Sequence, residues 1–215
     1  MVENSFQTQY DVTKKARIKR FYDENKTLIY SFVIILILIL GSTSYYLDSK
    51  ERKKIQLSEN YLQAKVYLEK NEIDKAKNLL KEIVFANDST YSTLSFFLLM
   101  NQKLINDNYE LLNLFEHLLS KNKYPEEIKN LLIYKKALFS ADFIDEAALL
   151  KSTKPLLNDD NIWKSHGLLL LADYFKSKGE YNKAIEFYQK IFTINNLHQD
   201  LYNHARSQLA IISNE

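Results

Sequence analysis

Residues 27–47 are the longest stretch of this chain without a charged side chain, and they read TLIYSFVIILILILGSTSYYL. A helix rises about 1.5 Å per residue, so a helix of this length just spans the roughly 30 Å hydrocarbon core of a bilayer. A single segment in that core must bond all of its backbone polar groups internally, which only a helix achieves. The sequence therefore predicts a basic arm at residues 1–26, a transmembrane helix at 27–47 and a polar region at 48–215.

A cleaved signal peptide is the alternative interpretation of the apolar stretch. Its aliphatic centre, residues 32–40, is short enough for such a peptide, and the small residues Ser42, Thr43 and Ser44 offer a cleavage point. Against this, the basic arm is long for a signal peptide. Tyr45 also continues the apolar stretch past the small residues, at a position where interfacial aromatic residues belong. We therefore expect a retained anchor.

Basic residues on the two sides of the stretch predict its orientation. They are Lys14, Lys15, Arg17, Lys19, Arg20 and Lys26 before it, and Lys50, Arg52, Lys53 and Lys54 after it. The positive-inside rule places the richer flank in the cytoplasm, and a long following domain does not count against this because long domains cross largely regardless of charge. We expect a cytoplasmic N-terminus and an extracytoplasmic C-terminal domain.

Charge and cysteine content exclude several classes of function. The formal net charge is +2, and the arm carries it, because the basic and acidic residues of the region 48–215 balance. A nucleic-acid-binding domain would normally have a basic excess, so we expect no nucleic-acid partner. The chain has no cysteine, which excludes a disulfide, a thiolate nucleophile and a cysteine-ligated metal.

The polar region is predicted to be all-α. The whole chain has only three glycines and two prolines, fewer than a protein rich in hairpin turns needs. Apolar residues recur at helical spacing, as at Tyr61, Ala64, Tyr67 and Leu68. Breaks between helices are predicted at residues 86–90, 105–108, 121–125, 154–160, 178–180 and 195–198.

The segment LADYFKSKGEYNKAIEFY at residues 171–188 resembles a tetratricopeptide repeat. That family has a small residue and an aromatic in the first helix, glycine and an aromatic at the turn, and alanine and an aromatic in the second helix. Small residues let the two helices approach closely, and aromatic residues fill the space between neighbouring pairs. The matching residues here are Ala172, Phe175, Gly179, Tyr181, Ala184 and Tyr188.

A second copy, AKVYLEKNEIDKAKNLL at residues 64–80, has Ala64, Tyr67, Asn71, Ile73, Ala76 and Leu80 in the equivalent places. Counting from Ala76 through Leu112 and Ala147 to Ala184 gives steps of 36, 35 and 37 residues, close to the roughly 34 of this repeat. We therefore predict a solenoid of helical hairpins with about four degenerate repeats and a final helix. The middle copies lack the turn glycine, and a generic helical bundle is the alternative.

The layout of the whole chain also resembles a narrower group, the ancillary SecYEG translocon subunit family. The matching segments are KKARIKRFYDENKTLI before the span, SENYLQAKVYLEKNEIDKAKNLLKEI after it, and LHQDLYNHARSQLAIIS near the end. The resemblance implies a protein of the bacterial inner membrane with a periplasmic repeat domain. It also implies a scaffold that docks beside the translocon together with periplasmic chaperones.

No catalytic, cofactor-binding or metal-ligating residue is predicted. The four histidines, His117, His166, His198 and His204, do not form an HExxH pair, and GxGxxG, P-loop and GxSxG patterns are absent. The acidic pairs Glu126/Glu127 and Asp159/Asp160 are explained by capping at helix starts. Trp163 is expected to pack at the start of the helix that leads to Leu168, with ligand stacking as the alternative.

The sequence therefore indicates a membrane-tethered, non-catalytic scaffold that binds other proteins through its helical-repeat domain. It does not identify the residues of the partner-binding groove. The alternative is a self-associating structural or regulatory envelope protein that coordinates cell division or envelope assembly, for which a homo-oligomer would be expected.

Overall fold

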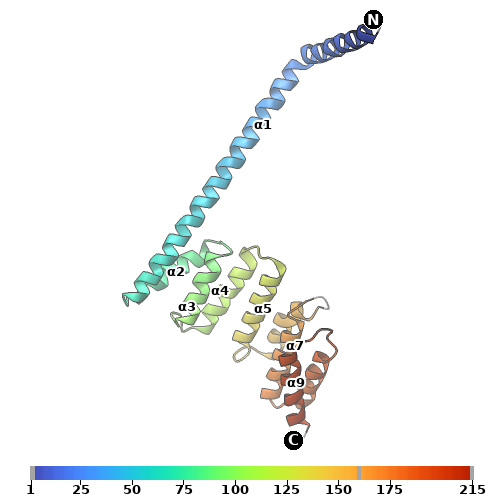
Figure 1. Cartoon of the computed structure of the whole chain (residues 1–215). Coiled ribbons are helices and arrows are strands. Elements are labelled where there is room, and N and C mark those ends of the chain that lie inside the picture. The colour runs from blue at the N-terminus through green and yellow to red at the C-terminus, as the bar shows by residue number, and fades with distance from the viewer. Residues whose placement is uncertain (1–2, 159–160, 214–215) are drawn as a thin grey trace. The chain divides into compact units, whose positions relative to one another are not determined.

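The computed structural model describes residues 3–158 and 161–213, with side chains from Lys19 onward. The described residues form α-helices and one 3-10 helix and no strand (Figure 1), which confirms the all-α prediction. Met1 and Val2 of the predicted arm and the acidic pair Asp159/Asp160 lie outside the described residues. The elements are α1 (Glu3–Glu69), α2 (Ile73–Phe85), α3 (Tyr91–Asn101), α4 (Asn108–Lys121), α5 (Glu126–Ser140), α6 (Glu146–Thr153), η1 (Lys154–Leu157), α7 (Lys164–Ser177), α8 (Tyr181–Ile191) and α9 (Gln199–Ile212).

The chain divides into two compact units, Met1–Gln56 and Leu57–Glu215. In the first unit α1 runs without a break through the apolar stretch at residues 27–47. The most apolar window of this helix has a mean hydropathy of 2.2, and none of that window is buried within the protein. Among the described residues, α1 is the one helix long and apolar enough to cross a membrane.

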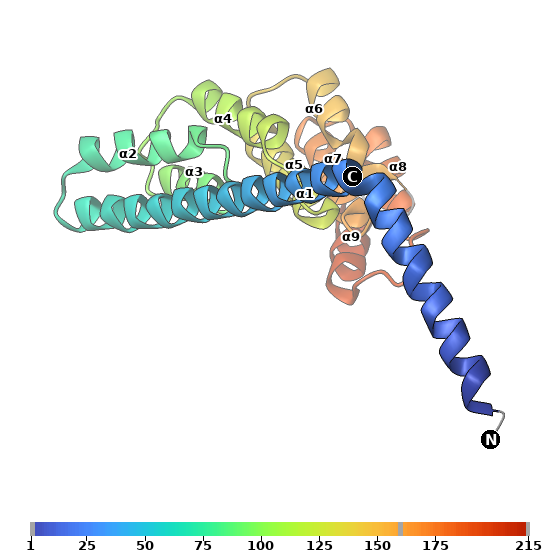
Figure 2. The ribbon, with the colours of Figure 1, turned by 90° about the horizontal axis from the view of Figure 1, so that it is seen from above.

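The second unit is a series of helical hairpins that begins with the last turns of α1, from Leu57 onward. Within it α2 packs with α3, α4 with α5, and α7 with α8, and α9 packs against both α7 and α8. Figure 2 shows α2, α4 and α6 in one row, with α3 and α5 in a second row beneath them. This two-layered succession of hairpins is the arrangement that the repeat pattern predicts.

Two clusters of apolar side chains form the core of this unit. The first joins the end of α1 to α2, α3 and α4, and at its centre the rings of Phe96 and Phe115 meet edge to face with centroids 4.4 Å apart. The second joins α5 to α9 and includes Phe175 and Tyr188. Helix α5 contributes to both, because Ala137 belongs to the second cluster while the ring of Phe139 packs against the first, 5.9 Å from that of Phe115.

Residues with left-handed backbone conformation follow three of the helices. Asn71, Lys103 and Gly179 have φ of 60°, 52° and 74° and follow α1, α3 and α7. In each case the next backbone N–H donates to a carbonyl five residues back, at 2.8–2.9 Å, which satisfies a carbonyl that the helix end would leave free. The sequence located the turn at 178–180. It did not list the break at residues 141–145, which separates α5 from α6.

Candidate protein-binding site

The residues predicted to pack the last repeat meet between α7 and α8. Ala172 and Phe175 of α7 and Ala184 and Tyr188 of α8 are all buried. The Tyr188 hydroxyl donates a hydrogen bond to Oδ1 of Asp173 on α7. Burial and this hydrogen bond both raise the pKa of Tyr188, so the phenol stays a proton donor that ties the two helices together.

The other predicted packing residues are buried or half-buried in the first hairpin and exposed elsewhere. In the first hairpin Ala64, Ala76 and Leu80 are fully buried, whereas Tyr67 is half-buried. Tyr181, the first residue of α8, is exposed. The remaining residue, Ala147, is also exposed.

The packing role inferred for Ala147 is therefore corrected. Asp145 caps α6 by accepting a hydrogen bond from the backbone N–H of Ala148 at 2.7 Å, so Ala147 lies in the first turn. The buried residues of α6 are Leu149 and Thr153, four apart on one face. The short helix thus presents its core face two residues later than the repeat alignment predicts.

A groove with a volume of about 440 Å³ lies where α4, α5 and α6 come together. Its apolar lining consists of Leu112, Leu119, Ile133, Ile144, Ala148 and Pro155. Two hydroxyls also line it, but Ser140 and Ser152 already donate to the backbone carbonyls of Ala137 and Leu149. The surface that remains for a ligand is therefore mainly apolar, the kind that accepts leucine-like side chains of another protein.

Charged side chains stand among the apolar residues of this groove. Lys136 of α5 donates to Oε1 of Glu116 on α4 at 3.0 Å, an ion pair that joins the two helices at the groove. Lys151 of α6 is exposed and also lines the groove. The groove thus combines apolar and charged side chains, as protein interfaces do.

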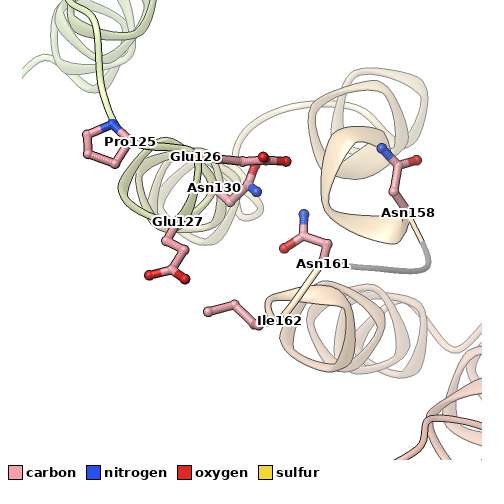
Figure 3. Close-up of a pocket in the computed structure, with 7 residues that line it drawn as sticks. All are labelled: Pro125, Glu126, Glu127, Asn130, Asn158, Asn161 and Ile162. Carbon is pink, nitrogen blue, oxygen red and sulfur yellow. The ribbon is translucent and has the colours of Figure 1, made fainter.

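A second pocket, with a volume of about 600 Å³, lies at the start of α5 (Figure 3). It is lined by Pro125, Glu126, Glu127, Asn130, Asn158, Asn161 and Ile162. Asn130 and Ile133 are three residues apart on α5 and therefore face the same side of that helix. Because Ile133 lines the groove and Asn130 lines the pocket, the two cavities lie near each other along α5.

An aromatic cluster begins directly after the pocket-lining residues Asn161 and Ile162. The ring of Trp163 stacks on that of Tyr134 with centroids 5.7 Å apart, and His166 lies 5.1 Å from Trp163. Desolvation by burial lowers the pKa of His166, and the nearby charge of His198 lowers it further, so this imidazole favours its neutral form. Asn161 accepts a hydrogen bond from the Trp163 backbone N–H at 2.9 Å, which ties this lining residue of the pocket to the cluster. Trp163 thus packs at the start of α7 as the sequence predicts.

Comparison with known protein families identifies the family of this chain. Residues 19–210 match the model of the tetratricopeptide repeat-like domain family. The chain belongs to this family. No significant match was found among curated proteins or among solved structures. The match begins before the apolar stretch, so the part of α1 from Lys19 onward lies within the matched region together with the hairpins.

Membership of the tetratricopeptide repeat-like family indicates a protein-binding scaffold, because solenoids of helical hairpins present extended surfaces to partners. The two cavities at α5 are formed by such hairpins. Among the described residues, no three histidine or acidic side chains gather as a metal site would require. The chemistry available at α5 is apolar contact, charge pairing and amide hydrogen bonding.

Sequence reasoning missed the residues of both cavities in this tetratricopeptide repeat-like chain. Leu112 was noted only as a substitute for alanine, and Glu126 and Glu127 only as helix-start residues. In the structure Leu112 lines the groove and both glutamates line the pocket. A large apolar residue at a repeat position that normally holds alanine was the available signal.

Proposed function

We propose that this protein is a membrane-tethered, non-catalytic scaffold that binds a segment of another protein in the groove at α4, α5 and α6. The observation that carries the proposal is the mainly apolar groove on a tetratricopeptide repeat-like chain whose α1 is able to span a bilayer. An apolar groove of this kind suits an amphipathic helix or an extended segment that inserts alternate side chains.

We further propose that the scaffold works beside the SecYEG translocon with periplasmic chaperones. The resemblance of the arm, the span and the repeats to the ancillary translocon subunit family supports this assignment. The basic arm supports a cytoplasmic N-terminus and a periplasmic repeat domain in the bacterial inner membrane. A scaffold held at the translocon would meet polypeptides as they emerge from it.

Site-specific photocrosslinking in intact membranes tests this proposal. A photoreactive amino acid at Leu119, which lines the groove, should crosslink to translocon and chaperone components. The same residue at Gln189, exposed on α8, is the matched control and should give far less of these products. Both positions are on the repeat domain, so the comparison isolates the groove.

The products also separate the alternative functions. Crosslinks from Leu119 mainly to a second copy of the chain would favour the self-associating envelope protein. Equal products from Leu119 and Gln189 would contradict binding in the groove.

A further inference from the structure

We propose that the polar pocket at the start of α5 receives a lysine or arginine side chain of the bound protein segment, whose apolar side chains occupy the neighbouring groove. This inference rests on the proposed protein-binding function and defines part of the ligand chemistry at the same site. Four observations carry it: the charge of the pocket, the free amide of Asn130, the closeness of the two cavities along α5 and the hydrogen bonds that hold Asn161.

The charge of the pocket favours a cation. Glu126 and Glu127 both line it from the first turn of α5, and neither forms an ion pair with another described residue. No lysine or arginine is among its described lining residues. A helix N-terminus alone would attract an anion, but two carboxylates already occupy that position. A second anion would be repelled, whereas an ammonium or guanidinium group would gain a charge-assisted hydrogen bond.

Asn130 provides the independent evidence for a ligand. The residue is only 9% exposed, and its side-chain amide forms no hydrogen bond with another residue that the structure describes. Figure 3 shows its amide group beside Glu126, at the pocket. Its amide is not among the fully buried side-chain groups that lack a partner, so it reaches the open space of the pocket, where it is available to a ligand. Oδ1 of Asn130 would accept a hydrogen bond from a cationic side chain that the carboxylates hold.

The closeness of the two cavities along α5 favours a protein segment as the source of the cation. Side chains three residues apart on a helix lie about 5–6 Å from each other, so Ile133 in the groove and Asn130 in the pocket are neighbours. Pro155 and Asn158 repeat this relation on the opposite wall. A segment lying along α5 would therefore present apolar side chains to the groove and one basic side chain to the pocket.

Hydrogen bonds already hold one lining residue of the pocket in place. Asn161 is held on two sides, because its Nδ2 donates to the carbonyl of Pro155 at 3.2 Å and its Oδ1 accepts from the backbone N–H of Trp163. Trp163 is itself stacked on Tyr134. A lining residue that is already ordered loses little conformational freedom on binding.

A displayed library of random 12-residue peptides tests the inference on the full-length protein in lipid nanodiscs. Selected peptides should contain a lysine or arginine at a fixed distance from a pair of large apolar residues. Selection on a variant with Glu126→Gln and Glu127→Gln should lose the basic residue but keep the apolar pair. A variant with Glu59→Gln and Glu82→Gln is the matched control, because it removes two exposed carboxylates from α1 and α2. It should select the same peptides as the natural protein.

The fluorescence of Trp163 is then used to measure the affinity of a peptide. It is the only tryptophan of the chain and follows the pocket-lining Ile162. A selected peptide without tryptophan should bind at least tenfold more tightly than its arginine-to-glutamine version. That ratio should fall to about one in the double glutamine variant and decrease in Asn130→Ala. Circular dichroism melts of each variant establish that the repeat domain remains folded.

Three outcomes would overturn the inference. Equal affinities of the arginine and glutamine peptides would show that the pocket does not prefer a basic side chain. Selected peptides without a basic residue would show the same. Neither result would contradict binding in the groove. A response to spermidine or to calcium chloride that the double glutamine variant abolishes would assign the pocket to a small cation. Failure to select any peptide would contradict a docking site here. If the Leu119 crosslinks still formed, the proposed function would survive with a different recognition mode.

Discussion

Ala184 has no exposed surface and lies where α8 presses against α7. We predict that Ala184→Leu lowers the free energy of unfolding by about 1–3 kcal/mol, because the added carbons must push two packed helices apart. Gln189→Ala, exposed on the same helix, should change it by less than about 0.5 kcal/mol. Lys183 is a poorer control, since its amino group pairs with Glu146 and Glu180 at 2.8 Å each. Urea denaturation of the detergent-solubilised protein measures the difference, and equal values for Ala184→Leu and Gln189→Ala would contradict the packing.

The residues with positive φ after the helices give a second prediction. The free energy of unfolding should change in opposite directions at two of them. Gly179→Ala should destabilise the protein by about 1–2 kcal/mol, because a Cβ is disfavoured at φ 74° even though open space surrounds it. Lys103→Gly should stabilise it by roughly 0.5–1 kcal/mol, because lysine occupies the same conformation at φ 52°. Thermal melts of the two variants should shift in opposite directions. Shifts of the same sign would mean that local packing, not backbone conformation, decides these turns.

At the scale of the element, α1 combines an apolar stretch with a helix of the repeat domain. We predict that Ile37→Arg disfavours membrane insertion by about 2.5–3.5 kcal/mol, because it places a charge near the middle of the span. Ile55→Arg is the matched control, since Ile55 lies on the same helix beyond the apolar stretch and is already exposed. Carbonate extraction should release more of the Ile37→Arg protein than of the Ile55→Arg protein. An N-terminus found at Tyr45 in the mature protein would instead support a cleaved signal peptide.

Helix α6 shows why elements of the candidate site could not be read from the sequence. A repeat alignment assigns positions at a fixed spacing, but the core face of a short helix depends on where its cap begins. The Asp145 cap and the break at 141–145 shift that face onto Leu149. The groove beside it depends on how far α4 and α6 stand from α5, which no local pattern determines.

For the whole molecule, the basic flank predicts orientation. A reporter that is active only outside the cytoplasm should be active when fused after Glu215, because the six basic residues of the arm favour the cytoplasm over the four that follow the span. A reporter active only in the cytoplasm, fused at the same position, should be silent. The reverse pair of results would place the repeat domain in the cytoplasm and contradict the proposed periplasmic partners.

The sequence alone determined the all-α class, the apolar stretch able to span a membrane and four packing residues of the last hairpin, Ala172, Phe175, Ala184 and Tyr188. These properties depend on composition and on local periodicity. The repeat residues Ala172, Gly179 and Ala184, for example, all lie within a single segment of the sequence. Only the tertiary structure decided that Leu112 and Ile133 line one groove and that Glu126 meets Asn158 in one pocket. Such residues lie far apart in the chain, and the packing of three helices on one another brings them together.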